Sequence, residues 1–214
     1  MTNLSTVFDN AHDRHYPKGQ ILLYQGERTH DVFHIQKGYV KVYDVTAGGD
    51  EKLLLILGPG DIFPLVWTFR AVSPLHYFYE TFDEADVCVI PRTRLLKSIE
   101  QSHEVTSHLL EYFVNRTKDL MSRIECIEST SAKHKVAQVL TYLATAHGDE
   151  VSKAGFKVRM PITHQSIADM AGIARETASL QLKELESEKT FAYNDDHSLT
   201  IHTDRLNEFL GSDS

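Results

Sequence analysis

The chain has 214 residues, a mass of 24.3 kDa and a formal net charge of −8. Charged residues make up 24% and hydrophobic residues 42%, which is typical of a globular protein of one or two domains and excludes a disordered chain. Residues 1–10 lack a basic start and an apolar stretch, and no apolar run reaches roughly 18 residues. We therefore expect no signal peptide, no membrane partner and a cytoplasmic location.

Cysteine usage and charge distribution narrow the possible sites further. The two cysteines, Cys88 and Cys126, are too few for a disulfide framework, a zinc finger or an iron–sulfur cluster held by four cysteines. The chain carries 13 basic and 18 acidic residues up to Glu128, and 9 basic and 12 acidic residues after it. Both parts are acidic, which argues against indiscriminate nucleic-acid binding but leaves room for a local reading surface.

Short apolar runs broken by glycine follow one another from Tyr16 to Ile90. The segments 48–50 and 58–61 are typical of tight turns, because glycine adopts positive φ without steric cost. This regular spacing predicts an antiparallel, jelly-roll-like β-barrel within an N-terminal domain of residues 1–102. The expected strands are Gln20–Tyr24, Val32–Ile35, Tyr39–Val45, Lys52–Leu57, His76–Phe82 and Val87–Ile90.

The pattern then changes to that of a long helix over residues 103–128, which contain neither glycine nor proline. Such a helix would be about 39 Å long, too long for a small barrel to cover. Its apolar positions lie three or four apart, which predicts a parallel coiled coil with a second copy of the chain. Packing of this face on the chain's own barrel is the alternative. The expected dimer interface comprises Leu109, Tyr112, Phe113, Arg116, Leu120, Ile124 and Ile127.

Residues 129–214 are typical of a winged helix-turn-helix. Polar residues at 129–131 predict a hinge and a fresh helix start, followed by a helix over 132–147 and a small hairpin within 151–160. Thr163 can cap a first short helix, Gly172 can form the tight turn, and a second amphipathic helix is expected from Arg175. An ordinary helical hairpin is the alternative. The strands expected for the wing are Phe191–Tyr193 and Leu199–Ile201.

In this order and spacing the chain resembles the CRP/FNR superfamily of bacterial transcription regulators. The resemblance covers residues 16–206 and implies a homodimer, with a cyclic-nucleotide-binding-like sensor barrel, a dimerisation helix and a DNA-binding winged helix. It also implies binding to palindromic double-stranded DNA and contact with RNA polymerase. The motifs that carry it are Pro17–Gly19, Gln25–Glu27, Phe33–Ile35, Gly38–Val42, Gly58–Phe63, Ile167–Ala168 and Ile173–Thr177.

The resemblance implies that the second helix of the motif enters the major groove. Arginine suits guanine and glutamate suits cytosine, so Arg175 and Glu176 are expected to read base edges. Leu180 stands where many relatives carry an arginine, which predicts a different half-site and strong salt sensitivity. Phosphate contacts are expected from residues 163–165 at the start of the first helix of the motif and from Lys183 on the second. The expected DNA contacts are Thr163, His164, Gln165, Arg175, Glu176, Thr177, Ser179, Leu180 and Lys183.

The effector pocket implied by the resemblance departs from the cyclic-AMP pattern. Relatives that bind cyclic AMP hold it with a Gly-Glu pair and an Arg-Ser pair, and these places read Pro64-Leu65 and Leu75-His76 here. An apolar pocket without arginine would desolvate a phosphate and offer it no partner, so we expect no cyclic AMP. Arg70 or Arg116 could supply a positive charge in another geometry, so a different nucleotide or another small-molecule effector stays open. The candidate pocket comprises Phe63, Leu65, Leu75, His76, Arg116, Leu120 and Met121.

Metal and haem sites are disfavoured. His12, His15, His30 and His34 match no recognisable ligand spacing, so no metal site is expected. His76 is the candidate axial ligand for a haem, but the aromatic cluster around it is more typical of plain core. No iron–sulfur cluster is expected.

We expect no enzyme activity, although two other functions stay open. A cupin-like metal enzyme would need histidines and a carboxylate converging on a metal. A protein-interaction module that has lost DNA binding is suggested by Leu180 and the acidic second half.

Overall fold

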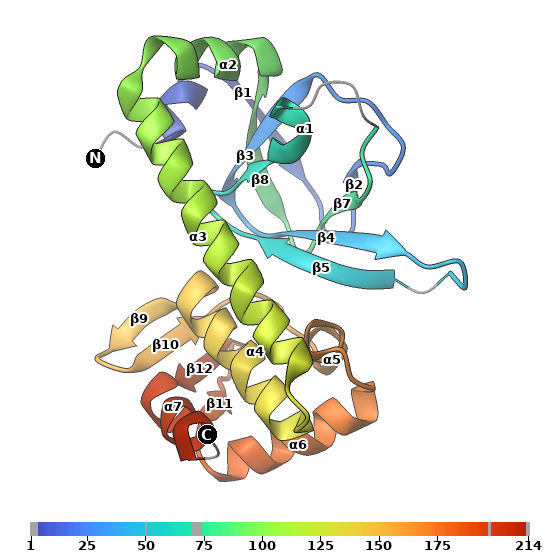
Figure 1. The fold of residues 1–214 in the computed structure, drawn as a ribbon, viewed down its shortest axis with the longest axis vertical. Helices are drawn as coiled ribbons and strands as arrows, with labels where there is room; N and C mark the ends of the chain where they lie inside the picture. Colours follow the sequence, from blue (N-terminus) through green and yellow to red (C-terminus); the bar gives the residue numbers. More distant parts are fainter. Residues whose placement is uncertain (1–3, 50, 70–73, 197, 213–214) are drawn as a thin grey trace. The chain divides into compact units, whose positions relative to one another are not determined.

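The structure, a computed structural model, describes residues 4–49, 51–69, 74–196 and 198–212. The chain folds into two compact units, Met1–Val114 and Asn115–Ser214 (Figure 1). The division falls within α3 (His103–Glu128), a continuous helix with the bounds that the sequence predicts.

The first unit contains two four-stranded antiparallel sheets, with strand orders β1-β8-β3-β6 and β2-β7-β4-β5. This confirms the expected jelly-roll-like architecture, although the strands form two separate sheets and no closed ring. The elements are η1 (Leu4–Phe8), β1 (His12–Tyr16), β2 (Ile21–Leu23), β3 (Asp31–Lys37), β4 (Val40–Val45), β5 (Glu51–Leu57), β6 (Ile62–Phe63), α1 (Leu65–Phe69), β7 (Phe78–Thr81), β8 (Ala85–Pro91) and α2 (Arg92–Gln101).

Aromatic rings fill the interior of this unit. Phe63 stacks on Phe33, with ring centroids 5.0 Å apart, and on Tyr79, with centroids 5.2 Å apart. Stacked aromatic pairs add to the stabilisation that burial of their apolar area gives. The same cluster contains the buried Leu23, Ile35, Val40, Val42, Leu57, Leu75, Val87 and Val89.

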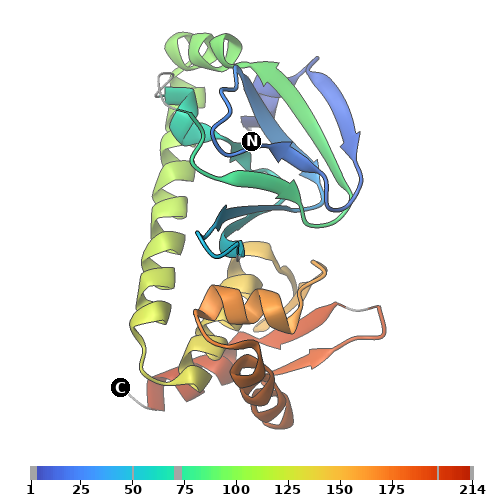
Figure 2. The same cartoon turned by 90° about the vertical axis from the view of Figure 1, so that its right-hand side faces the viewer.

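A second apolar cluster covers the other face of the sheet that contains β8. Val87 and Val89 belong to the inner cluster, whereas Cys88 and Ile90 pack with residues of η1, α2 and α3. Because both faces of β8 are buried over residues 87–90, this part of the strand is a continuous apolar run without alternation. In Figure 2, α1 lies beside the first half of α3, where the Phe69 and Phe113 rings are 6.0 Å apart.

Sequence patterns do not predict five elements of this unit: η1, β1, β6, α1 and α2. β1 reads His-Asp-Arg-His-Tyr and is mostly exposed, so no apolar alternation marks it. It becomes a strand because it pairs antiparallel with β8, with Asp13 opposite Cys88. Local propensity is weak for such an edge strand, and pairing decides its conformation.

A buried carboxylate ties the turn after β5 to the long helix. Asp61 is 6% exposed, and its Oδ2 accepts a hydrogen bond from the Gly58 amide at 2.7 Å. Its Oδ1 accepts one from the Tyr112 hydroxyl on α3 at 3.0 Å. These bonds satisfy a group that would otherwise be costly to bury, and they hold α3 against the barrel.

The second unit is a helical cluster with a four-stranded sheet of order β11-β12-β10-β9. Ser131 caps α4 by accepting a hydrogen bond from the His134 amide at 3.3 Å, as the polar start predicts. The final helix α7 is an element that the sequence patterns do not predict. The elements are α4 (Ala132–His147), β9 (Asp149–Ser152), β10 (Gly155–Val158), α5 (His164–Ala171), α6 (Arg175–Ser187), β11 (Phe191–Tyr193), β12 (Leu199–His202) and α7 (Thr203–Ser212).

Two glycines with positive φ provide a test of the first unit's packing. Gly38 has φ +80°, and a Cβ there would overlap the Glu84 carbonyl oxygen, whereas Gly49 has φ +89° and open space around it. We expect Gly49→Ala to cost about 1–2 kcal/mol from backbone strain alone. Gly38→Ala adds the steric overlap and should cost more than about 3 kcal/mol. Urea unfolding of both variants measures the difference, and equal losses would contradict the packing at Gly38.

Candidate nucleic-acid interface

Helices α5 and α6 form the helix-turn-helix that the sequence predicts. The Thr163 side chain caps α5 by accepting a hydrogen bond from the Ser166 amide at 3.1 Å. Gly172 ends the helix in the left-handed conformation, with φ 64°. Ala174 precedes α6 without a side-chain cap, so the first amides of α6 are left for other acceptors.

Helix α6 has one buried face and one exposed face. Ala178, Leu182 and Leu185 are at most 1% exposed and pack inside the unit. Arg175, Glu176 and Lys183 are exposed, and the Leu180 side chain is 63% exposed. Thr177 and Ser179 are partly buried. The helical period therefore brings most of the expected base-reading residues to one outer surface.

The three expected phosphate contacts at the start of α5 are engaged within the unit. The Thr163 hydroxyl caps its own helix, and Gln165 Nε2 donates to Asp169 Oδ1 at 2.7 Å. His164 Nδ1 lies 2.9 Å from Ser179 Oγ, and its Nε2 lies 3.0 Å from Tyr193 Oη. The sequence analysis places Tyr193 in a wing strand but does not predict its contact with His164. The only signal for it in the sequence is an aromatic residue at the end of that strand.

The C-terminal half of α6 is tied to the start of α4. Lys133 Nζ lies 2.9 Å from Glu184 Oε1 and 2.7 Å from Glu188 Oε1. These contacts place one lysine against two of the carboxylates that make this part of the chain acidic. They also orient α6 against α4.

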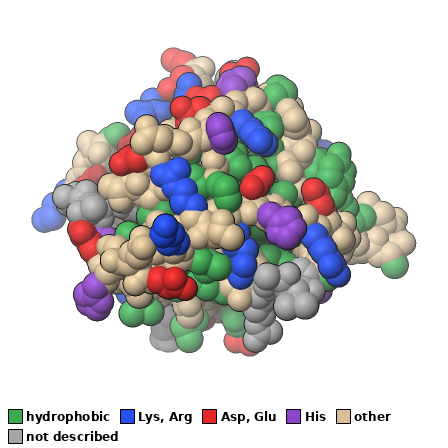
Figure 3. Space-filling model, turned by 90° about the horizontal axis from the view of Figure 1, so that it is seen from above, with side chains coloured by type: hydrophobic (Ala, Val, Ile, Leu, Met, Phe, Trp, Pro, Cys, Tyr) green, Lys and Arg blue, Asp and Glu red, His purple; other side chains and the backbone are tan. Residues whose placement is uncertain are grey.

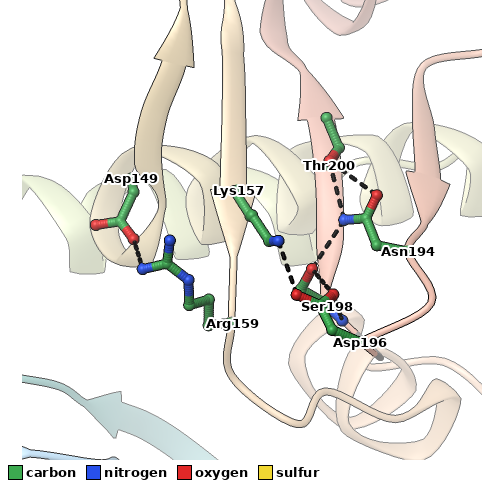
Figure 4. A network of polar contacts seen from close by, with 7 residues as sticks. All are labelled: Asp149, Lys157, Arg159, Asn194, Asp196, Ser198 and Thr200. Atoms are coloured by element: carbon green, nitrogen blue, oxygen red, sulfur yellow. Dashed lines mark hydrogen bonds and ion pairs between the residues drawn. The ribbon is translucent and has the colours of Figure 1, made fainter.

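The wing is held by a polar network (Figure 4). Lys157 on β10 contacts Asp196 Oδ2 at 2.7 Å, and the Ser198 amide donates to Asp196 Oδ1 at 3.1 Å. Lys157 and Ser198 hold the pKa of the Asp196 carboxyl well below its usual range. Asn194 bridges Ser198 and Thr200 across the turn. The turn residue His197 lies outside the described residues.

The face drawn in Figure 3 carries mixed charge. Basic and acidic side chains are interspersed there with histidines and hydrophobic side chains. An electrostatic footprint for nucleic acid is normally a basic patch or stripe, and this face has none among its described residues.

The expected pocket residues of the first unit are mainly core. Phe63, Leu65 and Leu75 are at most 7% exposed and belong to the two apolar clusters. His76 is exposed, with its ring 5.5 Å from that of Trp67. Arg70 lies outside the described residues.

The models of two protein domains match this chain. The cyclic nucleotide-binding domain matches residues 13–102, and the Crp-like helix-turn-helix domain matches residues 134–208. The chain belongs to the CRP/FNR superfamily of transcription regulators. This family consists of regulators and not of enzymes, and its members dimerise and bind DNA.

Individual relatives agree with this family. The chain is 23% identical over 199 residues to the cAMP-activated global transcriptional regulator CRP of Pasteurella multocida, covering 93% of this chain and 90% of that protein. It is 29% identical over 196 residues to the HTH-type transcriptional regulator ArcR of Staphylococcus epidermidis, covering 85% and 78%. The structure of FixK2 from Bradyrhizobium japonicum matches with a TM-score of 0.77 at 18% identity, over 92% of this chain and 96% of that one.

Helix α3 carries an exposed apolar face. Leu120, Ile124 and Ile127, which the sequence assigns to a dimer interface, are about half exposed at 47%, 56% and 50%. The other assigned residues pack within their own unit: Leu109 is buried, Tyr112 bonds to Asp61, Phe113 contacts Phe69, and Arg116 pairs with Asp119 at 3.3 Å. Further exposed apolar residues on α3 are Leu110, Val114 and Met121.

The cysteines and histidines offer little chemistry in this CRP/FNR member. Cys88 Sγ donates to Asp13 Oδ1 at 3.0 Å, and burial raises the pKa of its thiol to about 12. Burial also raises the pKa of Cys126. Within the described ranges, no three histidine, cysteine or acidic side chains are grouped to hold a metal ion. None of the described helices is long and apolar enough to cross a membrane.

His147, next to Arg116 in the second unit, makes stability depend on pH. Burial, and to a lesser extent the charge of Arg116, lowers the pKa of His147 to about 4, against about 6.5 in an unfolded chain. The unfolded state therefore binds more protons between these values, and stability should fall as the pH drops from about 6.5 to 4. The loss is up to about 3 kcal/mol. Urea unfolding followed by circular dichroism should show this slope reduced in His147→Gln, and an unchanged slope would contradict it.

Proposed function

We propose that the protein is a homodimeric transcription regulator that binds a palindromic DNA sequence through α6. The observation that carries this proposal is the outer face of α6, where Arg175 and Glu176 stand exposed while the opposite face is locked into the unit. Residues at the N-terminus of a recognition helix are the ones that reach base edges in the major groove.

The residue types suggest how a half-site is read. Arg175 can donate two hydrogen bonds to a guanine, and Glu176 can accept one from a cytosine. Leu180 offers an apolar contact to a thymine methyl group in place of a charge. Lys183 supplies a phosphate contact one turn further along the same helix.

A second copy of the chain is the proposed cover for the apolar face of α3. The proposed seam shares only Ile124 with the interface expected from the sequence, because four of the expected residues pack within their own unit. Its residues Leu110, Val114, Met121 and Ile124 follow one another in steps of four, seven and three residues, which is the spacing of a coiled-coil seam. Burying this face would pair two winged units, as reading two half-sites about 34 Å apart requires.

The proposed sensor does not use cyclic AMP. At the positions of the Glu and Arg that hold cyclic AMP in relatives, this chain has Leu65, 7% exposed, and Leu75, 2% exposed. Both leucines belong to apolar clusters. A phosphate there would lose its water without gaining a partner. The effector is a different small molecule bound beside Leu120 and Met121 of α3, or the regulator acts without one.

This proposal outweighs the two other functions. A cupin-like enzyme would need a metal-binding cluster, and an interaction module without DNA binding would have no use for the exposed Arg175 and Glu176. The regulator would work in the cytoplasm, where it would bind its DNA and contact RNA polymerase.

Selection from a random duplex pool tests the proposal. Dialysed protein at low salt should enrich a palindrome with half-site centres about 10 base pairs apart. The same palindrome should emerge, at the same enrichment, with cyclic AMP added. Enrichment only with cyclic AMP would contradict the proposed sensor, and no enrichment under any condition would favour the interaction module.

Arg175→Ala should weaken binding to the selected palindrome by about 1–3 kcal/mol and relax specificity at one base position. Equilibrium titration against operators with single-base changes measures both effects. Lys183→Ala is the matched control, because loss of a phosphate contact weakens all sequences about equally. Unchanged affinity in Arg175→Ala would exclude its assignment to base reading.

Ile124→Asp should dissociate the dimer, because it buries a charge in the seam. We expect the dimer dissociation constant to rise at least tenfold, which is about 1.4 kcal/mol. Sedimentation analysis measures it. Ser122→Asp, on an exposed position of α3 away from the seam, is the control. Equal behaviour of the two variants would refute the seam.

A further inference from the structure

His164 joins three elements of the winged unit. It is the first residue of α5, its Nδ1 contacts Ser179 Oγ on α6 at 2.9 Å, and its Nε2 contacts Tyr193 Oη on β11 at 3.0 Å. We propose that His164 is a positioning residue that fixes the recognition helix relative to the wing and does not bind phosphate. This inference rests on the proposed DNA-binding function and names a specificity-determining contact within it.

The hydrogen-bonding capacity of the ring supports this role. A neutral imidazole has one donor and one acceptor nitrogen, and a protonated one has two donors. Both partners of His164 are hydroxyl groups, which can donate or accept. The bridge is therefore satisfied in either tautomer and in the protonated form. A phosphate could gain an N–H from His164 only if one of these bonds broke.

The neighbouring side chain provides the contrast. Gln165 is exposed, and its amide bonds to Asp169 four residues along the same helix. Its hydrogen bond therefore joins no second element. The side chain can leave that bond for a phosphate without disturbing α6 or the wing.

The position of Ser179 links the bridge to sequence reading. Ser179 lies one turn after Arg175 and three residues after Glu176, so it shares their side of α6. A bond from α5 to this point adds to the apolar core in setting the depth and rotation at which the base-reading residues are presented. The bond from the same ring to Tyr193 positions the wing relative to α5 as well. Without His164, the apolar core would still hold α6 and the wing, but this polar link between their outer surfaces would be lost.

The first experiment compares His164→Ala with Gln165→Ala on the operator selected with the unaltered protein. We expect His164→Ala to reduce discrimination between the operator and its single-base variants about tenfold, with an unchanged dependence of log affinity on log salt. Gln165→Ala should keep the discrimination and weaken binding to all sequences about equally, because a phosphate contact carries no base information. His164→Gln, which retains a donor and an acceptor, should recover part of the discrimination.

Double variants test whether the effect passes through the bridge. Combined with Ser179→Ala or Tyr193→Phe, the loss caused by His164→Ala should be less than additive in log affinity, because the partner is already gone. Gln165→Ala should be additive with both. An equal loss of affinity for the operator and all its single-base variants in His164→Ala, together with additivity, would identify His164 as a phosphate contact and overturn the proposal.

A measurement without DNA separates this inference from the proposed function. In the free protein, nitrogen-15 NMR should detect a slowly exchanging ring N–H of His164, lost in the Ser179→Ala, Tyr193→Phe double variant. Failure of the DNA selection with this signal present would refute only the DNA-binding function. Rapid exchange of the ring N–H in the unaltered protein would refute the bridge itself.

Discussion

Burial of one face of α6 is the constraint on which the candidate interface depends. Ala178, Leu182 and Leu185 lie inside the winged unit at 0%, 1% and 0% exposure. Full burial of each leucine contributes about 2 kcal/mol. Because a helix is rigid, fixing this face also fixes the opposite one, so Arg175 and Glu176 are presented outward with no further contacts of their own. The Lys133 contacts to Glu184 and Glu188 then orient the far end of the same helix.

The two units use polar groups for different purposes. In the first unit, Asp61 joins a turn to α3 from a buried position, so its hydrogen bonds to Gly58 and Tyr112 are needed to offset desolvation. In the second unit, the polar contacts of His164 and Asp196 lie near the surface and add links between elements that already pack or pair with one another. Such contacts contribute less to stability than to the geometry of the surface.

The acidic charge of the chain is compatible with DNA binding because part of it is engaged locally. Lys133 contacts two carboxylates, and Lys157 contacts the wing residue Asp196. The exposed cations of the recognition helix are Arg175 and Lys183. The interface therefore depends on few charges, and its specificity depends on how accurately they are positioned.

The sequence by itself determined the class of fold, the bounds of α3 and α4, the cap at Thr163, the turn at Gly172 and the buried face of α6, because apolar periodicity and capping residues are local signals. It could not find β1, which has no apolar pattern and exists through its pairing with β8. Nor could it find the bridge from His164 to Ser179 and Tyr193, which are 15 and 29 residues away. Only the tertiary structure decided these features, because hydrogen bonds between distant residues leave no periodic trace in the chain.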